Sequence, residues 1–236
     1  MSRLIKKGLY GKIKIEEWRD EILSEKEILH SSAPLPSVRR LPLYLTVLEE
    51  FEREGREWIS TTDFSEVLFL KPIQVRKDLA HTGIIGKPKK GFKVDELIAT
   101  INNFLGWNNL TDAFIVGAGA LGSALLGYTG FQHHGLNIVA AFDVSPLVIG
   151  KIIHGKKVLP LEQLQDLGQR MKVRLGIITV PSEGAQNAAD KLIEAGISGI
   201  WNFSPVKLHV PPNVVVQRED LSSGLAVLSV KLGRFD

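Results

Sequence analysis

The chain has 236 residues, enough for one large or two modest domains, and 44% of them are apolar and 23% charged, a balance that allows a buried core. No apolar run reaches the roughly 18 residues of a membrane span, and the absence of cysteine excludes disulfides and thiolate metal sites. The first residues show no apolar signal-peptide region, so we expect a cytoplasmic protein.

Positive charge is concentrated in one short segment. Residues 71–93 carry seven Lys or Arg and a single acid, Asp78, although the net charge of the whole chain is only +3. This pattern favours an anionic partner such as nucleic acid, and a solvated basic loop would produce it as well.

One helix is predicted in the N-terminal part of the chain, after a disordered basic tail over residues 1–11. We expect an N-terminal extension over 1–35 with an amphipathic helix at 12–30, followed by a proline-containing loop at 31–37. A further helix is predicted from Arg39, with Pro42 in its first turn and Gly55 at its end.

Two shorter helices and a hairpin are predicted next. Ser60 or Thr61 can cap the first short helix, and Pro72 can open the second after a tight turn near 69–71. Glycine and proline between short apolar ends predict a hairpin over 84–94. This order predicts a winged-helix DNA-binding domain over 36–94.

From residue 95 onward, helices alternate with strands. Strands are predicted at 113–116, 136–146, 173–180, 198–203 and 213–217, and helices at 95–107, 121–131, 159–170 and 182–196. The alternation predicts an α/β Rossmann domain over 95–219, a doubly wound parallel sheet with helices on both faces. A last helix is expected within 220–236.

The sequence GAGALG at 117–122 has the spacing of a dinucleotide-binding loop, between an apolar strand and a helix. Gly117 allows a tight turn, Gly119 lets the backbone approach a pyrophosphate, and Gly122 lets the helix pack closely. Asp143 ends the next strand, where an acid accepts hydrogen bonds from the adenosine ribose and repels a 2′-phosphate. The motif therefore predicts NAD(H) rather than NADP(H).

No residue pattern indicates catalysis or a metal site. None of the six histidines lies in an obvious catalytic setting, and the adjacent His133 and His134 lack metal-ligand spacing. An apolar pocket walled by Tyr128 and Phe203 would disfavour the charged nicotinamide of NAD⁺ through desolvation, and so would prefer NADH without reacting with it. Plain core packing is an equally good explanation of these aromatic residues.

Several runs resemble the bacterial family of redox-sensing repressors called Rex, between about Pro36 and Leu232. They are RRLPLYL, IST, QVRKDL, TGIIGK, VGAGALGSAL, AFDVSP, TVPSEGAQ, GIWNFSPVKL and VPPNVVV. The resemblance implies a homodimer that binds a palindromic operator when NAD⁺ dominates and is released by NADH. It also implies that the helix within 220–236 is a dimerisation helix exchanged between the subunits.

The motif and the resemblance together indicate two sets of site residues. The residues expected to bind NADH or NAD⁺ as a regulatory ligand are Gly117, Ala118, Gly119, Ala120, Leu121, Gly122, Tyr128, Asp143, Thr179, Pro181, Asn202 and Phe203. The residues expected to contact double-stranded DNA are Arg40, Ser60, Thr61, Gln74, Arg76, Lys77, Lys87, Lys89 and Lys90.

Two other functions are compatible with the residues themselves. One is an NAD-dependent dehydrogenase with a basic accessory domain. The other is a nucleotide-gated architectural DNA-binding protein that has no specific operator.

Overall fold

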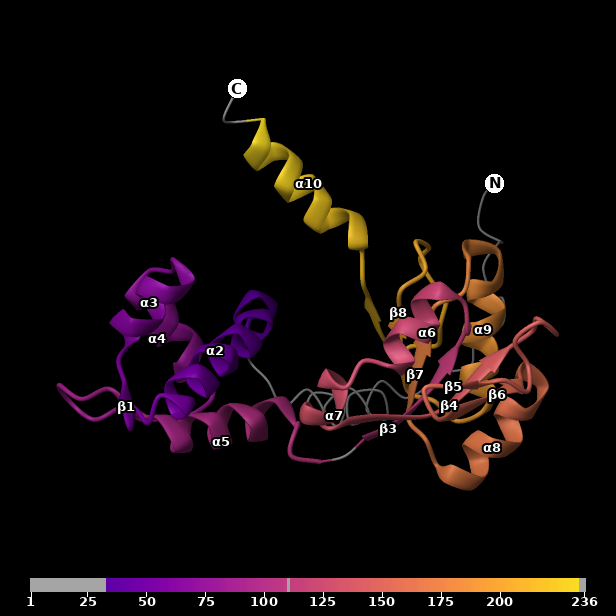
Figure 1. The fold of residues 1–236 in the computed structure, drawn as a ribbon, viewed down its shortest axis with the longest axis horizontal. Coiled ribbons are helices and arrows are strands. Elements are labelled where there is room, and N and C mark those ends of the chain that lie inside the picture. Colours follow the sequence, from indigo (N-terminus) through magenta and orange to yellow (C-terminus); the bar gives the residue numbers. More distant parts are fainter. Residues whose placement is uncertain (1–32, 110, 234–236) are drawn as a thin grey trace, which may run out of the picture. The chain divides into compact units, whose positions relative to one another are not determined.

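The computed structural model describes residues 33–109 and 111–233 (Figure 1). The chain divides into two compact units, with the boundary between Leu105 and Gly106. The helix predicted at 12–30 lies outside the described residues. The boundary lies at the end of the helix that the structure has at Val94–Leu105, so this helix belongs to the first unit. The sequence predicted the helix at 95–107 and placed it at the start of the second domain.

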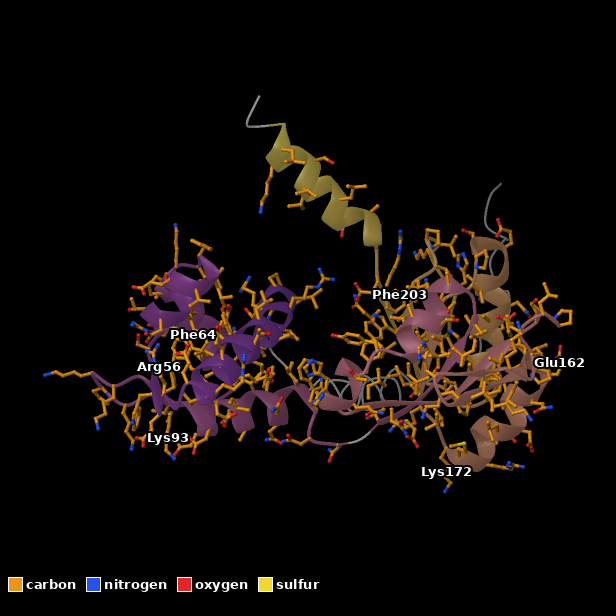
Figure 2. All side chains as sticks on the ribbon, viewed as in Figure 1. Arg56, Phe64, Lys93, Glu162, Lys172 and Phe203 are labelled. Atoms are coloured by element: carbon orange, nitrogen blue, oxygen red, sulfur yellow. The ribbon has the colours of Figure 1, made fainter. Side chains whose placement is uncertain are left out.

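The first unit contains helices and one small antiparallel sheet. Its elements are α2 (Leu35–Arg53), β1 (Trp58–Ile59), α3 (Thr61–Leu68), α4 (Pro72–Ala80), β2 (Phe92–Lys93) and α5 (Val94–Leu105). Tyr44 and Phe64 are completely buried and meet edge to face with ring centroids 5.2 Å apart. Figure 2 labels Phe64 in this core. The winged-helix prediction is thereby confirmed in its element order.

Helix α2 begins earlier than predicted. It starts at Leu35 rather than Arg39, because Pro36 suits the first turn of a helix, where a backbone N–H has no helical partner. Pro42 consequently lies inside the helix and not in its first turn. Gly55 follows the end of α2 with a φ of +74°, as expected of a helix stop.

The predicted hairpin is present as a short wing. Lys87 and Gly91 form an antiparallel bridge around a turn at 88–90, and β2 pairs with β1. Gly91 has a φ of +90°, and a Cβ there would lie 2.1 Å from the carbonyl oxygen of Ile59. Only glycine therefore lets the wing approach β1 this closely.

The second unit is built on a seven-stranded sheet in the order β5-β6-β4-β3-β7-β8-β9. The strands are β3 (Thr111–Val116), β4 (Leu136–Asp143), β5 (Ile152–Ile153), β6 (Lys156–Pro160), β7 (Leu175–Ile178), β8 (Gly199–Asn202) and β9 (Val215–Arg218). All neighbouring pairs are parallel except β5 with β6. The six parallel strands follow the doubly wound order, so the Rossmann prediction is confirmed, although β5 and β6 were not predicted.

Helices cover both faces of this sheet. They are α6 (Ala120–Leu126), α7 (Gly130–His133), η1 (Leu161–Gln163), α8 (Leu164–Met171) and α9 (Ser182–Glu194). One apolar cluster joins the sheet to α8 and α9, and a second joins it to α6. The single helix predicted over 121–131 is wrong, because α6 ends at Leu126 and α7 is separate.

The last described element is α10 (Leu221–Leu232), as predicted. In residues 33–109 and 111–233, none of the helices combines the length and the apolar character needed to cross a membrane.

Candidate functional site

The first unit has a groove of about 560 Å³ between the wing, the start of α3 and helix α4. Its lining includes six of the predicted DNA-contacting residues: Ser60, Thr61, Arg76, Lys87, Lys89 and Lys90. The groove thus joins positive side chains from α4 and the wing to the N-terminus of α3. A surface of this charge suits the phosphates of a duplex.

The N-terminus of α3 is held by a capping box. The Ser60 hydroxyl accepts a hydrogen bond from the backbone N–H of Asp63 and donates one to the Asp63 carboxylate, which also accepts the Ser60 N–H at 2.7 Å. Burial alone would raise the pKa of Asp63, but the bonds from Ser60 and Arg56 lower it below the ordinary value. The Ser60 hydroxyl is therefore engaged in the cap, and Thr61 is the freer hydroxyl beside the groove.

Trp58, which was not among the predicted site residues, contacts two wing lysines. The ammonium nitrogens of Lys87 and Lys90 lie 5.0 and 5.2 Å from the centroid of its ring. A cation over an aromatic ring at this range is attracted by about 0.5–1 kcal/mol at an exposed site. The arrangement depends on the pairing of β1 with β2, which only the folded chain reveals.

Helix α4 is fastened to α2 through a buried carboxylate. Asp78 has no exposed surface and accepts hydrogen bonds from Arg40 (Nε 2.6 Å, Nη2 2.8 Å), from the Tyr44 hydroxyl at 2.6 Å and from the Gln74 amide at 2.9 Å. Arg40 is 23% exposed at its side chain. The network sets the position of α4 and therefore of its exposed Arg76 and Lys77.

The electrostatics of this network follow from its geometry. Burial alone would raise the pKa of Asp78, but the hydrogen bonds from Arg40, Tyr44, Ser37 and Gln74 hold it well below its usual range. Burial and the bond to Asp78 raise the pKa of Tyr44 well above its usual value. The expected DNA contacts of Arg40 and Gln74 therefore compete with a structural role, because both side chains bind Asp78.

In the second unit, the glycine loop has the geometry that the motif predicts. Gly117 has a φ of +102°, and a Cβ on Gly122 would lie 1.9 Å from the carbonyl oxygen of Gly117. A Cβ on Gly119 would meet nothing within 4 Å, so this residue faces open space at the start of α6. The first N–H groups of that helix, those of Ala120, Leu121 and Gly122, lack helical partners and suit a pyrophosphate in this space.

Asp143 bends toward the glycine loop. One carboxylate oxygen accepts the N–H of Ala118 at 2.7 Å, and the other accepts the N–H of Ser145 at 2.8 Å. Asp143 is half-buried, and each of its carboxylate oxygens keeps an acceptor position beyond the bond it already makes. Ala118 itself is buried, and its N–H is already bound by Asp143 rather than free for a phosphate.

Two of the expected dinucleotide-binding side chains support the loops around the site. The Thr179 hydroxyl bonds the carbonyl oxygens of Val116 and Gly117 at 3.1 and 2.8 Å, so it secures the turn of the glycine loop. Asn202 is only 1% exposed, and its amide bonds the Val206 carbonyl and the Ser204 N–H, both at 2.9 Å. The side chain of Asn202 therefore holds its own loop rather than facing a ligand.

Aromatic side chains gather beside α6. A hollow of about 400 Å³ is lined by Leu125, Tyr128, Phe131, Trp201, Phe203 and Glu219. Their rings form a series, with centroids 4.8 Å apart for Tyr128 and Phe131, 5.5 Å for Phe131 and Trp201, and 4.9 Å for Trp201 and Phe203. Tyr128 and Phe203 thus line one hollow, as the sequence suggested, and Figure 2 labels Phe203.

The residues expected from the sequence to bind the dinucleotide do not include all of the residues that line this hollow. Phe131, Trp201 and Glu219 line it, and the Trp201 indole N–H donates to the Glu219 carboxylate at 3.1 Å. The signal for Trp201 was its period-two spacing from Phe203, which puts both rings on one face of the strand end. Pro181, another expected contact, is exposed as the residue preceding α9.

No group of three or more His, Asp or Glu side chains that could hold a metal ion is found in the part of the chain that the structure describes.

Comparison with known proteins finds a family match in each of the two parts of the chain. Residues 33–80 match a family model described as a putative DNA-binding protein N-terminus, and residues 108–206 match one described as a CoA binding domain. A curated protein from Treponema denticola, the redox-sensing transcriptional repressor Rex, is 52% identical over 84% of this chain and 94% of its own length. The protein of the same name from Bacteroides fragilis is 39% identical over 86% of this chain and 92% of its own.

Solved structures give the same result. The Rex-family repressor RSP in complex with β-NAD⁺ and operator DNA matches with a TM-score of 0.79 and 35% identity, over 86% of this chain and 93% of its own. RSP in complex with β-NADH matches with a TM-score of 0.79 and 34% identity, over 86% of this chain and 96% of its own.

Proposed function

The chain belongs to the Rex family of redox-sensing transcriptional repressors, and from this we propose that it binds a palindromic operator and is released when NADH binds. The observation that carries the proposal is the groove that joins Thr61, Arg76 and the wing lysines on one surface of the first unit. The family consists of DNA-binding regulators, which favours this function over a dehydrogenase.

The DNA is bound by the unit formed by residues 36–94 and the helix that follows. Helix α4 enters the major groove, where Arg76 and Lys77 reach base edges or phosphates. The wing lysines, Lys87, Lys89 and Lys90, contact phosphates of the DNA backbone. Ser60 and Thr61 place the N-terminus of α3 near a phosphate. Arg40 and Gln74 act mainly through Asp78, by holding α4 in position.

The dinucleotide is bound by the second unit. Its pyrophosphate lies over Gly119 and the first N–H groups of α6, and its adenosine ribose bonds Asp143. The nicotinamide lies in the hollow that contains Tyr128 and Phe203. The ring of NAD⁺ is charged and that of NADH is neutral, so an apolar wall favours NADH by the desolvation cost of the charge.

Helix α10 supports a homodimer. All its described side chains are exposed, and five of them are large and apolar, each 52–64% exposed: Leu225, Val227, Leu228, Val230 and Leu232. A helix with so much uncovered apolar surface is stabilised when a partner covers it. Exchange of α10 between two copies of the chain covers the helix of each copy. A two-fold dimer then presents two α4 helices to a palindrome.

Binding of the two ligands is reciprocal by thermodynamic necessity. NADH shifts the equilibrium only by its greater affinity for the released state, so operator DNA must weaken NADH binding by the same factor. A repressor acts on chromosomal DNA, which bacterial cells keep in the cytoplasm, and we place the protein there.

A gel shift tests this function. The full chain is mixed with a duplex from the region upstream of its own gene, at constant salt, because phosphate contacts make the affinity depend strongly on salt. We expect a discrete complex that NADH dissociates and NAD⁺ does not. A complex that is indifferent to NADH would contradict the proposal, and oxidation of NADH by a carbonyl substrate would favour a dehydrogenase.

A further inference from the structure

Helix α4 presents one continuous exposed stripe. Its members, at spacings i, i+3, i+4 and i+7, are Ile73, Arg76, Lys77 and Ala80. The opposite face of the helix carries Val75, Asp78 and Leu79, which are buried. Side chains at these spacings share a face, so all four members of the stripe turn toward the same neighbour.

The first member of the stripe is apolar. Ile73 is 53% exposed, and it is the second residue of α4, which begins at Pro72. A single exposed aliphatic residue is common and needs no explanation by itself. The position of Ile73 is what carries weight, because it shares a face with Arg76 and Lys77, and Arg76 lines the groove next to the wing.

In a helix-turn-helix, residues near the N-terminus of the second helix reach the base edges. An isoleucine there donates and accepts no hydrogen bond, so it gains only from an apolar contact. The apolar group that the major groove offers is the C5-methyl of thymine. We propose that Ile73 recognises a thymine C5-methyl in each half of the operator and is a specificity-determining residue beside Arg76.

This inference depends on the proposed DNA binding, and a chemical double-mutant cycle tests it. The full chain selects a duplex from a random-sequence pool, and each thymine of that duplex is then replaced singly by deoxyuridine, which lacks only the C5-methyl. We expect one thymine per half-site at which the replacement weakens binding about fourfold, the effect of one buried carbon at about 0.8 kcal/mol.

The same replacement is then measured with two variants of Ile73. With Ile73→Ala, the fourfold effect should fall to less than roughly 1.5-fold, because the partner of the methyl group is gone. With Ile73→Val, which keeps most of the side chain, an effect of roughly twofold should remain. Amide hydrogen exchange in α2 and α4 that matches the wild type shows that the first unit of each variant is folded.

Val67→Ala provides the matched control. Val67 is an aliphatic residue of α3 and is 45% exposed. The hollow around it is lined by four acids and one base, Glu50, Glu54, Asp63, Glu66 and Arg56, so its net negative charge repels phosphate. The fourfold effect of deoxyuridine should persist in this variant.

The outcomes separate the two ideas. If the chain selects no duplex, the repressor function and the inference both fail. If it selects one that has no methyl-sensitive thymine, or if the sensitivity persists in Ile73→Ala, the repressor function stands and the role of Ile73 is wrong.

Discussion

Replacement of Asp78 by alanine tests how α4 is held. Asp78 is fully buried and accepts two hydrogen bonds from Arg40, one from Tyr44 and one from Gln74. Removal of one partner of a buried, hydrogen-bonded ion pair typically costs about 3–5 kcal/mol, and part of that cost is a buried Tyr44 hydroxyl left without its acceptor. We therefore expect Asp78→Ala to destabilise the first unit by about 3–5 kcal/mol.

Amide hydrogen exchange on the full chain measures this effect locally. Exchange in α2 and α4 should accelerate by about a hundredfold to a few thousandfold, since each 1.4 kcal/mol is a factor of ten. NADH affinity should not change, because the second unit has a core of its own. As a control, Asp166→Ala removes the exposed ion pair with Arg170 and should change the stability of α8 by less than about 1 kcal/mol. An equally small effect of Asp78→Ala would refute the proposed role of the network.

The contribution of Asp78 to the stability of the first unit depends on pH, and it is lost at low pH. The pKa of Asp78 is lowered in the folded chain, because the bonds from Arg40, Tyr44 and their neighbours outweigh the effect of burial. Its contribution is therefore fully present above the unfolded pKa of about 3.9 and is lost as the pH falls below that value. The stability difference between the wild type and Asp78→Ala should be constant from pH 5 to 7 and shrink below about pH 4, by at most about 1.4 kcal/mol per pH unit.

Three further substitutions test the remaining parts of the mechanism. A Cβ at Gly119 meets nothing within 4 Å, so Gly119→Val should fold, lose NADH binding in calorimetry and stay on operator DNA at any NADH concentration. Arg76→Ala should weaken operator binding in a gel shift by about 1–3 kcal/mol and leave NADH binding intact, and equal loss of both would indicate misfolding instead. Leu228→Asp places a charge among the exposed apolar residues of α10 and should shift the protein toward monomer in analytical ultracentrifugation, whereas an unchanged dimer would exclude α10 as the interface.

Local signals in the sequence were enough for most of the fold. The cap at Ser60, the helix start at Pro72 and the stop at Gly55 each depend on residues within one turn, and the structure places all three as predicted. The predicted start of α2 is too late because two nearby prolines, at 34 and 36, favour a loop in the sequence, although Pro36 fits the first turn of a helix. Strands β5 and β6 were missed because β5 has only two residues and the edge pairing depends on contacts made after folding.

The roles of side chains were harder to predict than their positions, because burial and hydrogen-bond partners are properties of the folded chain. Asp78 stood out in the sequence only as the one acid in a basic segment, yet its hydrogen bonds from Arg40, Tyr44 and Gln74 make it the anchor of the helix that bears Arg76. Asn202 belongs to a run that marks the ligand edge, but its buried amide bonds its own loop. A matching run therefore locates a site, and the hydrogen bonds of each polar side chain decide whether it remains free for a ligand or holds the residues that are.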